Sequence, residues 1–336
     1  MADLKLMRKE HETVRNNVGY YDFTHQLLEV TGKDAAKFLD NMFVNGIENI
    51  DVGKAVYTTM LNEDGIIIDD VIVFRLGDEK FWVSTLYIDD MIKWFDKHKK
   101  NETLNYVNIT DNVTMFAIQG PKSRDLVNSI VENNVNDLQF FNIIGNKVKD
   151  LDIKVARAGF TGELGYEFYV DSSKKGLLEK EIVEKGKDFG LENITTDVIV
   201  GSLPAEKGYV LMSDLEGTNP LEVGYGWTVD WDSKFVGKDK LLKEKYNITR
   251  DLLGFTVNDD STVASGDDIF ARGEKVGKVT KFTYGFTVEK NIGYALIDIT
   301  KVKIGDKVTI KTSNGDVEVI LTNRVFYDED DERVRA

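Results

Sequence analysis

The chain has 336 residues, enough for two or three domains, and its 58 acidic and 43 basic side chains give it a net charge of -15. This acidic balance argues against a nucleic-acid partner, because phosphate binding needs a concentrated basic surface. The chain has no cysteine, and its three histidines lack ligand spacing, so neither a disulfide nor a metal site is predicted. No apolar run approaches the length of a membrane span, and the N-terminus is too polar for a secretory signal, so we expect a cytoplasmic protein with no membrane partner.

The first third of the chain predicts a β-rich module covered by helices. Apolar residues recur at helical spacing in the predicted helices, and the strand-like runs are short and bounded by turn residues. The helices are predicted at residues 4–18, 34–44 and 88–97, and the strands at 26–30, 54–61, 66–75 and 80–85.

Two adjacent acids in the strand predicted at 66–75 are the first candidates for a functional site. Asp69 and Asp70 follow three isoleucines and precede Val-Ile-Val-Phe. A carboxylate in apolar surroundings has a raised pKa unless donors or a cation hold it, and such acids concentrate at functional sites. Side chains alternate along a strand, so Asp69 points to one face while Asp70 points to the other, together with Phe74. The alternative is an ordinary hairpin with solvated acids, since residues 62–65 have good turn chemistry.

A glycine-rich segment at residues 154–170, KVARAGFTGELGYEFYV, is the second candidate. Its GxxGxxG spacing, followed by a strand, disfavours a dinucleotide site, and the glycines are expected to allow a tight turn or a close approach to a flat ligand. Glu167 shares a strand face with Tyr169 among large apolar neighbours. A buried carboxylate there could accept two parallel N–H bonds from an amino-pyrimidinone edge. The alternative is a glutamate on the solvent side of a hairpin.

The remaining segments predict helices followed by a small all-β domain. Helices are predicted at 123–131, 175–190 and 239–246, with a further one possible at 196–203, and a strand is predicted at 113–118. After residue 247 short strands alternate with turns, which is typical of a compact β domain, so we place a boundary near residue 245.

Several segments, in this order and spacing, resemble the glycine-cleavage T-protein family of tetrahydrofolate-dependent one-carbon transferases. They are EHETVRNNVGYYDFTH, AVYTTMLNEDGIIIDDVIV, FAIQGP, RAGFTGELGYEFYV, NPLEVGYGWTVDW with FVGK, and VGKVTKFTYGFTVEKNIGYALI. The resemblance implies an α+β fold in which three domains form a ring around the folate, with a C-terminal β-barrel. It also implies a discontinuous folate-binding domain 1 at 1–48 and 112–246, an inserted domain 2 at 49–111, and a barrel domain at 247–336.

The resemblance also implies roles for individual residues. Asp70 is similar to the family's catalytic aspartate beside the reactive folate nitrogens, and Asp69 is the fallback if the strand register is shifted by one. Glu167 is similar to the acid that grips the pterin edge. The other folate-binding positions that the resemblance implies are Tyr57, Met60, Tyr87, Phe160 and Trp227.

The sequence departs from the family pattern, and these departures decide which reaction we predict. The family's arginine-bearing LRLE segment appears here as LPAE at 203–206, and Ser84 stands where an asparagine is usual. We therefore expect a methyltransferase or demethylase that moves a carbon unit from a small methylated donor to tetrahydrofolate. One alternative is the aminomethyltransferase reaction of the glycine cleavage system, with an aminomethyl donor and a lipoyl carrier protein as partner. An alternative of another class is a non-catalytic folate-binding protein.

Overall fold

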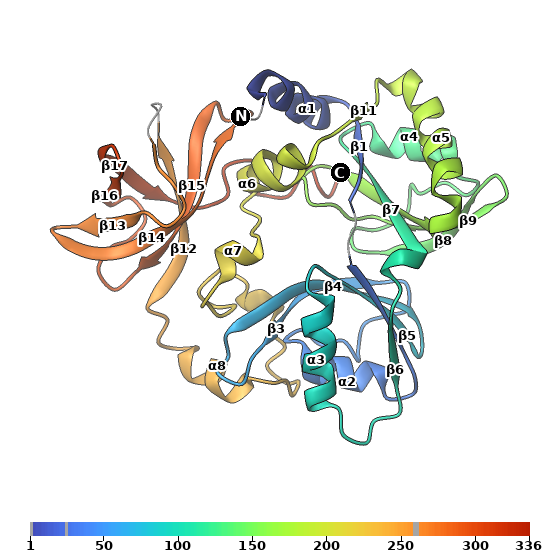
Figure 1. Cartoon of the computed structure of the whole chain (residues 1–336), viewed down its shortest axis with the longest axis horizontal. Coiled ribbons are helices and arrows are strands. Elements are labelled where there is room, and N and C mark those ends of the chain that lie inside the picture. The colour runs from blue at the N-terminus through green and yellow to red at the C-terminus, as the bar shows by residue number, and fades with distance from the viewer. Residues whose placement is uncertain (1–2, 24–25, 258–261) are drawn as a thin grey trace.

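Two β-sheets and a β-barrel form three lobes around a common centre in the computed structural model (Figure 1). The structure describes residues 3–23, 26–257 and 262–336, so Thr24 and His25, at the end of the first family-like motif, lie outside it. The predicted α+β fold, a three-lobed ring with a C-terminal barrel, is confirmed. No helix in the described part of the chain is long and apolar enough to cross a membrane.

The first lobe contains a six-stranded sheet in the order β11-β1-β7-β10-β9-β8. Its strands are β1 (Gly19–Asp22), β7 (Val113–Gln119), β8 (Ile143–Val148), β9 (Leu151–Ala156), β10 (Gly165–Asp171) and β11 (Glu192–Asn193). One face of β10, with Tyr166, Phe168 and Val170, packs against helices α4 (Ser123–Ile130) and α5 (Lys175–Gly186). The other face of β10 is thereby left to the interior of the ring. Helix α1 (Leu4–Asn16) precedes β1 and begins at Asp3, whose carboxylate accepts the backbone N–H groups of the first turn.

The second lobe is an antiparallel sheet in the order β3-β4-β5-β2-β6. Its strands are β2 (Gln26–Thr31), β3 (Ala55–Leu61), β4 (Ile67–Gly77), β5 (Lys80–Thr85) and β6 (Asn105–Asn108), and helices α2 (Ala35–Met42) and α3 (Ile88–His98) cover one face. The predicted boundary at residue 48 does not follow this sheet, because β2 and α2 belong to the same lobe as β3. Because β2 belongs to the second sheet, we propose to draw this boundary before β2, near residue 25.

The uncovered faces of the two sheets pack against each other through an apolar cluster. Phe74 of β4 and Trp82 of β5 contact the ring of Tyr169 on β10, with ring centroids 5.8 and 5.7 Å apart. These faces also carry Asp70 and Glu167, so packing of the sheets brings these two acids to the interior of the ring.

Short helices connect the sheets to the barrel. They include the π-helix η4 (Val198–Ser202), α6 (Leu203–Glu206), α7 (Met212–Leu215), the 3-10 helix η5 (Gly226–Thr228) and α8 (Lys238–Glu244). Three other 3-10 turns are η1 (Thr110–Asn112), η2 (Ser172–Lys174) and η3 (Lys187–Phe189). Figure 1 shows α6 and α7 between the barrel and the two sheets.

The third lobe is a closed barrel in the order β12-β15-β14-β13-β16-β17. Its strands are β12 (Arg250–Val257), β13 (Asp268–Ala271), β14 (Glu274–Gly285), β15 (Lys290–Asp298), β16 (Lys307–Thr312) and β17 (Gly315–Thr322). Closure leaves no exposed sheet edge among these six described strands. After β17 the chain returns to the centre, where the backbone N–H groups of Phe326 and Tyr327 donate to the carbonyl of Glu206.

Candidate functional site

Asp69 and Asp70 point to opposite faces of β4, as the alternation predicts. Asp69 pairs with Met60 across the strands and faces the apolar core under α2 and α3, where it is 1% exposed. The hydroxyl of Thr85 donates to its Oδ2 at 2.6 Å, while Oδ1 has no partner among the described residues. Burial raises the pKa of Asp69 to about 7. Asp69 is therefore a core acid, and Asp70 is the acid that faces the interior of the ring.

Asp70 is partly buried and lies against the aromatic side chains of the neighbouring strand and loop. Tyr57 on β3 donates its hydroxyl to Asp70 Oδ2 at 3.0 Å, and the ring of Tyr57 meets that of Tyr225 at 5.2 Å. Burial raises the pKa of Asp70 to about 6, although the hydrogen bond from Tyr57 opposes that rise. A carboxyl with this pKa is mostly ionised at neutral pH and can still take up a proton.

Glu167 lies on the inner face of β10 and is only 4% exposed. The hydroxyl of Tyr169 donates to Glu167 Oε2 at 2.7 Å, and burial raises the pKa of this carboxyl to about 7. Tyr21 of β1 is close enough for the charge of Glu167 to contribute, after burial, to the raised pKa of its phenol. Its hydroxyl also forms a hydrogen bond with the backbone of Phe160. Glu167 is thus held by one strong donor in a site bordered by tyrosines.

Two contacting pairs of aromatic side chains lie near the two acids. In the first pair, Phe160, whose backbone forms a hydrogen bond with Tyr21 near Glu167, stacks on Tyr209 with centroids 5.4 Å apart and ring planes 23° from parallel. Burial raises the pKa of Tyr209, and the nearby phenol of Tyr225 adds to that rise. Tyr225 in turn contacts Tyr57, the hydrogen-bond donor to the other acid. We call these two pairs the aromatic wall.

The glycines of the GxxGxxG segment support this wall by internal packing. A Cβ atom on Gly159 or Gly165 would lie 2.1 or 2.2 Å from the amide of Gln119. These glycines therefore make room for the flat side-chain amide of Gln119. Gln119 donates to a backbone carbonyl of the segment and accepts from Thr161 at 2.8 Å. Gly162 supplies the tight turn with φ of +76°.

The other predicted folate-binding residues lie in different environments in the structure. Met60 lies in the core under the second sheet, opposite Asp69, so it is not on the face that carries Asp70. Tyr87 is partly exposed at the start of α3, where its backbone N–H donates to the hydroxyl of Thr85. Trp227 is 71% exposed, with its ring 6.4 Å from Tyr225 at the outer end of the aromatic wall.

Two charged residues near Asp70 were missed by the sequence reasoning. Asp214 of α7 is 1% exposed, and its charge contributes to the raised pKa of Asp70. Lys281 of the barrel strand β14 lies 2.8 Å from Asp214 Oδ2, while Asp214 Oδ1 has no hydrogen-bond partner within the residues that the structure describes. Asp214 lies in an otherwise ordinary turn-rich segment, so no local pattern distinguished it.

A buried ionic network holds α1, α6 and the C-terminal segment together beside the wall. Arg15 donates to Glu163 at 3.2 Å and to Glu206 at 3.0 Å, and its guanidinium lies 4.1 Å from the ring centre of Tyr327. Burial alone would raise the pKa of Glu206, but His11 and Arg15 lower it to about 2. This network stabilises the ionised form of Glu206, and we assign it a structural role.

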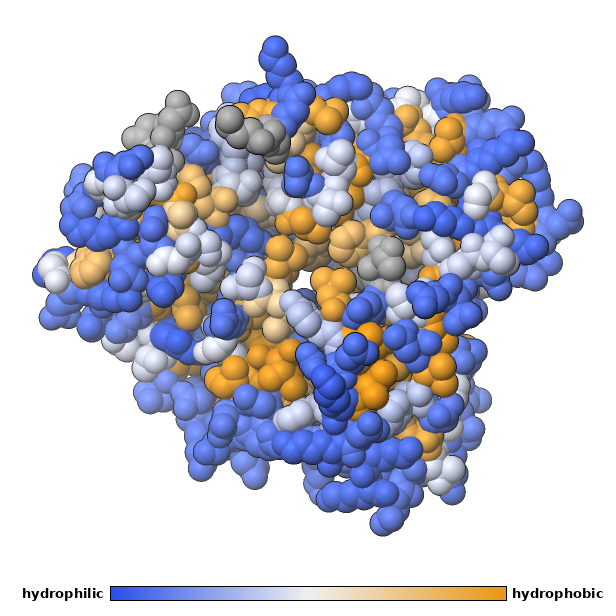
Figure 2. Space-filling model, in the orientation of Figure 1, coloured by the Kyte–Doolittle hydropathy of each residue, from blue (hydrophilic) through white to orange (hydrophobic). Residues whose placement is uncertain are grey.

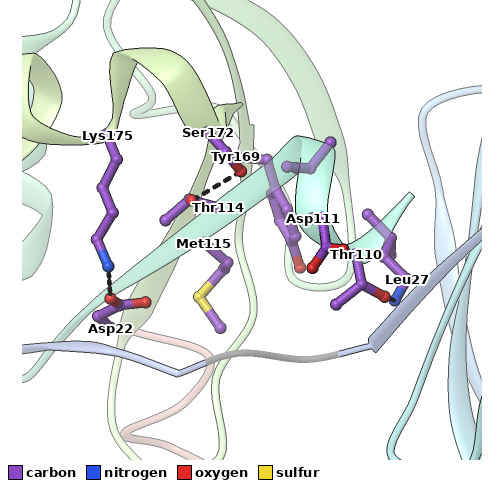
Figure 3. A pocket seen from close by; sticks show the side chains of 10 residues that line it. Asp22, Leu27, Thr110, Asp111, Thr114, Met115, Tyr169, Ser172 and Lys175 are labelled. Atoms are coloured by element: carbon purple, nitrogen blue, oxygen red, sulfur yellow. Dashed lines mark hydrogen bonds and ion pairs between the residues drawn. The ribbon is translucent and has the colours of Figure 1, made fainter. Parts of the chain in front are cut away.

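A separate pocket of about 200 Å³ opens at the seam between the two sheets (Figure 3). Lys175 forms an ion pair with Asp22 on one side of it, and Thr114 contacts Ser172 at 3.0 Å. Tyr169 lines this pocket, whereas neither Asp70 nor Glu167 does. The surface is also hollowed near the centre of the molecule, where the three lobes meet and apolar side chains gather (Figure 2).

Comparisons with known proteins agree with this architecture. The model of the GCVT N-terminal domain matches residues 3–233, and that of the glycine cleavage T-protein C-terminal barrel domain matches residues 250–328. The aminomethyltransferase of Thermoanaerobacter sp. (strain X514) is 32% identical over 326 residues, covering 95% of this chain and 88% of the relative. The aminomethyltransferase of Halothermothrix orenii is 33% identical over 313 residues, covering 91% and 87%.

A solved structure shows the same fold. The glycine cleavage system aminomethyltransferase T from Bartonella henselae superposes with a TM-score of 0.86 at 20% identity, covering 96% of this chain and 90% of that one. Two family models that together span most of the chain, and relatives above 30% identity along nearly its full length, identify the family. The chain belongs to the glycine cleavage T-protein family of tetrahydrofolate-dependent one-carbon transferases.

Proposed function

We propose that this enzyme transfers the carbon of a thiol-bound aminomethyl group to tetrahydrofolate. The relatives at 31–33% identity are named aminomethyltransferases, which favours this reaction over the methylated donor that we first predicted. In the reaction the S–CH2 and CH2–NH2 bonds break, two bonds form from the carbon to N5 and N10 of the folate, and the two N–H protons leave with the thiol and the ammonia. A lipoyl carrier protein is the proposed source of the thiol.

The inner face of the ring offers groups that fit a reduced pterin. Glu167 accepts only the Tyr169 hydroxyl among the described residues, so it retains acceptor capacity for the two parallel N–H groups of an amino-pyrimidinone edge. The aromatic wall that runs from Glu167 toward Asp70 is suited to a flat heterocycle. The single observation that carries the proposal is this wall, which has the buried Glu167 near one end and the partly buried Asp70 near the other.

Asp70 is proposed to control charge beside the reactive nitrogens. Positive charge develops there as the carbon is transferred, and a fixed carboxylate in a poorly hydrated site stabilises it. With a pKa of about 6, Asp70 can also accept a proton from the attacking amine at neutral pH. Tyr57 keeps the carboxylate in place through its 3.0 Å hydrogen bond.

A small methylated donor is the second candidate, and one local feature supports it. The segment at 203–206 has Pro204 where the family pattern has arginine, so α6 brings no cation to the donor side. The carboxylate of Glu206 is occupied by His11 and Arg15. The donor site therefore differs in charge from the pattern expected of the family.

The experiment compares donors directly. The enzyme is incubated with tetrahydrofolate and either an aminomethyl-loaded lipoyl carrier protein or a panel of N-, O- and S-methylated compounds, and the folate products are identified by mass. We expect methylenetetrahydrofolate from the aminomethyl donor, and its loss in Asp70→Asn. Methyltetrahydrofolate formed only from a methylated donor would instead support the second candidate, and binding of tetrahydrofolate without any product would support the non-catalytic alternative.

A further inference from the structure

The outer end of the aromatic wall opens onto a surface that carries an exposed tryptophan. Trp227 is 71% exposed although tryptophan is normally well buried, and exposed tryptophans are typical anchors of protein interfaces. Its ring contacts Tyr225, which contacts Tyr57, the residue bonded to Asp70. The exposed tryptophan therefore marks a place where a molecule from outside could approach the proposed catalytic acid.

Helix α8 continues this surface. Four residues after Trp227, Trp231 lies under the ammonium group of Lys245 at 4.0 Å, and the chain between the two tryptophans spans at most about 14 Å. The ring of Tyr246 lies 5.8 Å from the same ammonium group and is 87% exposed, and Leu242 is also exposed. Exposed apolar side chains thus extend from the wall onto the end of α8. We call Trp231, Leu242, Lys243, Lys245 and Tyr246 the α8 surface.

The charge around α8 is opposite to that of the whole protein. Residues 234–250 contain five lysines and one arginine against two acids, in a chain with a net charge of -15. Lys240 pairs with Asp64 at 3.9 Å and Arg250 with Glu222 at 2.7 Å. Lys243 and Lys245 form no ion pair with any residue in the described ranges. A basic, partly apolar surface on an acidic protein favours an acidic partner.

We propose that the α8 surface is the docking site for an acidic carrier protein whose flexible thiol-bearing arm passes Trp227 to reach Asp70. This inference rests on the proposed function, because that reaction needs a carrier. Trp231 of this surface is joined to Trp227 by a chain segment that spans at most about 14 Å, and the charge of the surface complements an acidic carrier. The exposed aromatic and aliphatic side chains supply the apolar contact, and the lysines steer the encounter.

The test uses charge reversal on α8 with a matched control elsewhere. The variant Lys243→Glu/Lys245→Glu is compared with Lys180→Glu/Lys185→Glu on α5, another solvated helix in a different lobe (Figure 1). Tyr246→Ala is compared in the same way with Leu177→Ala, also exposed on α5. Each protein is assayed in reverse with methylenetetrahydrofolate, ammonium and either the reduced lipoylated H-protein of a glycine cleavage system or free dihydrolipoamide.

We expect the α8 reversal to raise the KM for the H-protein about tenfold and to remove its salt dependence, because two steering charges change sign. Tyr246→Ala should raise this KM about threefold, as expected for an interface contact. The rate with free dihydrolipoamide should stay within about twofold of wild type for both, since neither change touches the wall. The α5 variants should match wild type with both thiols.

The outcomes separate this inference from the proposed function. An unchanged KM for the H-protein in both α8 variants, with wild-type turnover intact, would overturn the docking site and leave the reaction standing. Equal losses with the H-protein and with free dihydrolipoamide would also overturn it, because the site itself would then be damaged. A change in self-association by light scattering, with the KM unaltered, would identify a second copy as the occupant. Failure of the wild type with both thiols would overturn the proposed function and this inference together.

Discussion

Replacement of Glu167 by glutamine should change how the stability of this protein depends on pH. Glutamine has the same shape and can still accept the hydroxyl of Tyr169, but it does not titrate. Burial raises the pKa of Glu167 from 4.5 to about 7, and this rise corresponds to about 3 kcal/mol. Below pH 4.5 the carboxyl is protonated in both the folded and unfolded states, so it adds no pH dependence there. Between pH 4.5 and 7 only the unfolded chain releases the proton, so this group makes the wild type lose stability as the pH rises.

The assay is urea unfolding of wild type and Glu167→Gln at several pH values from 4.5 to 8. The contributions of all other groups largely cancel in the difference between the two proteins. The free energy of unfolding of the variant relative to wild type should increase by about 3 kcal/mol across this range. A constant difference would show that Glu167 titrates normally, and the reasoning from its burial would then be wrong. A difference that falls with pH would mean that a cation holds the ionised carboxylate.

Three further changes test other parts of the structure. Tyr57→Phe removes the hydrogen bond that stabilises ionised Asp70, so the acidic limb of the pH profile of kcat/KM should move to higher pH, and an unmoved limb would count against that pairing. Gly165→Ala should destabilise the protein by about 1–3 kcal/mol in thermal unfolding, because its Cβ would meet Gln119, and Gln119→Ala in the same chain should restore part of the loss. Arg15→Met should cost about 3–5 kcal/mol in urea unfolding because it leaves two buried glutamates without their cation, and a near-neutral result would contradict the role of that network.

The choice of Asp70 and Glu167 as the acids of the site came from the resemblance to the family. Alternation along 66–75 predicted only that Asp69 and Asp70 point to opposite faces of the strand, as they do in the structure. It could not place Met60, because the hairpin register and the bulge between Met60 and Leu61 decide which residue faces Asp70 across the strands. The register makes Thr59 that residue.

The rest of the site depends on long-range packing that no local period encodes. Tyr21, Tyr209 and Tyr225 come from three separate segments, and each lies in a sequence that reads as an ordinary strand start or loop. The predicted boundary at residue 48 differs from the one that we propose on sheet membership, because β2 pairs with β5, a strand far along the chain, and looks like part of the preceding segment. The barrel was easier to predict, since its short strands and turns recur at regular spacing.

The most direct measurement of the central claim is an equilibrium titration of tetrahydrofolate into wild type, Asp70→Asn and Glu167→Ala, paired with turnover. The account predicts that Asp70→Asn binds tetrahydrofolate within about threefold of wild type and loses nearly all turnover, because its acid acts on the reacting nitrogens. Glu167→Ala should bind at least about tenfold more weakly, since the pterin edge loses its charged acceptor. Unchanged affinity in Glu167→Ala together with full turnover in Asp70→Asn would contradict the placement of a reduced pterin between these two acids.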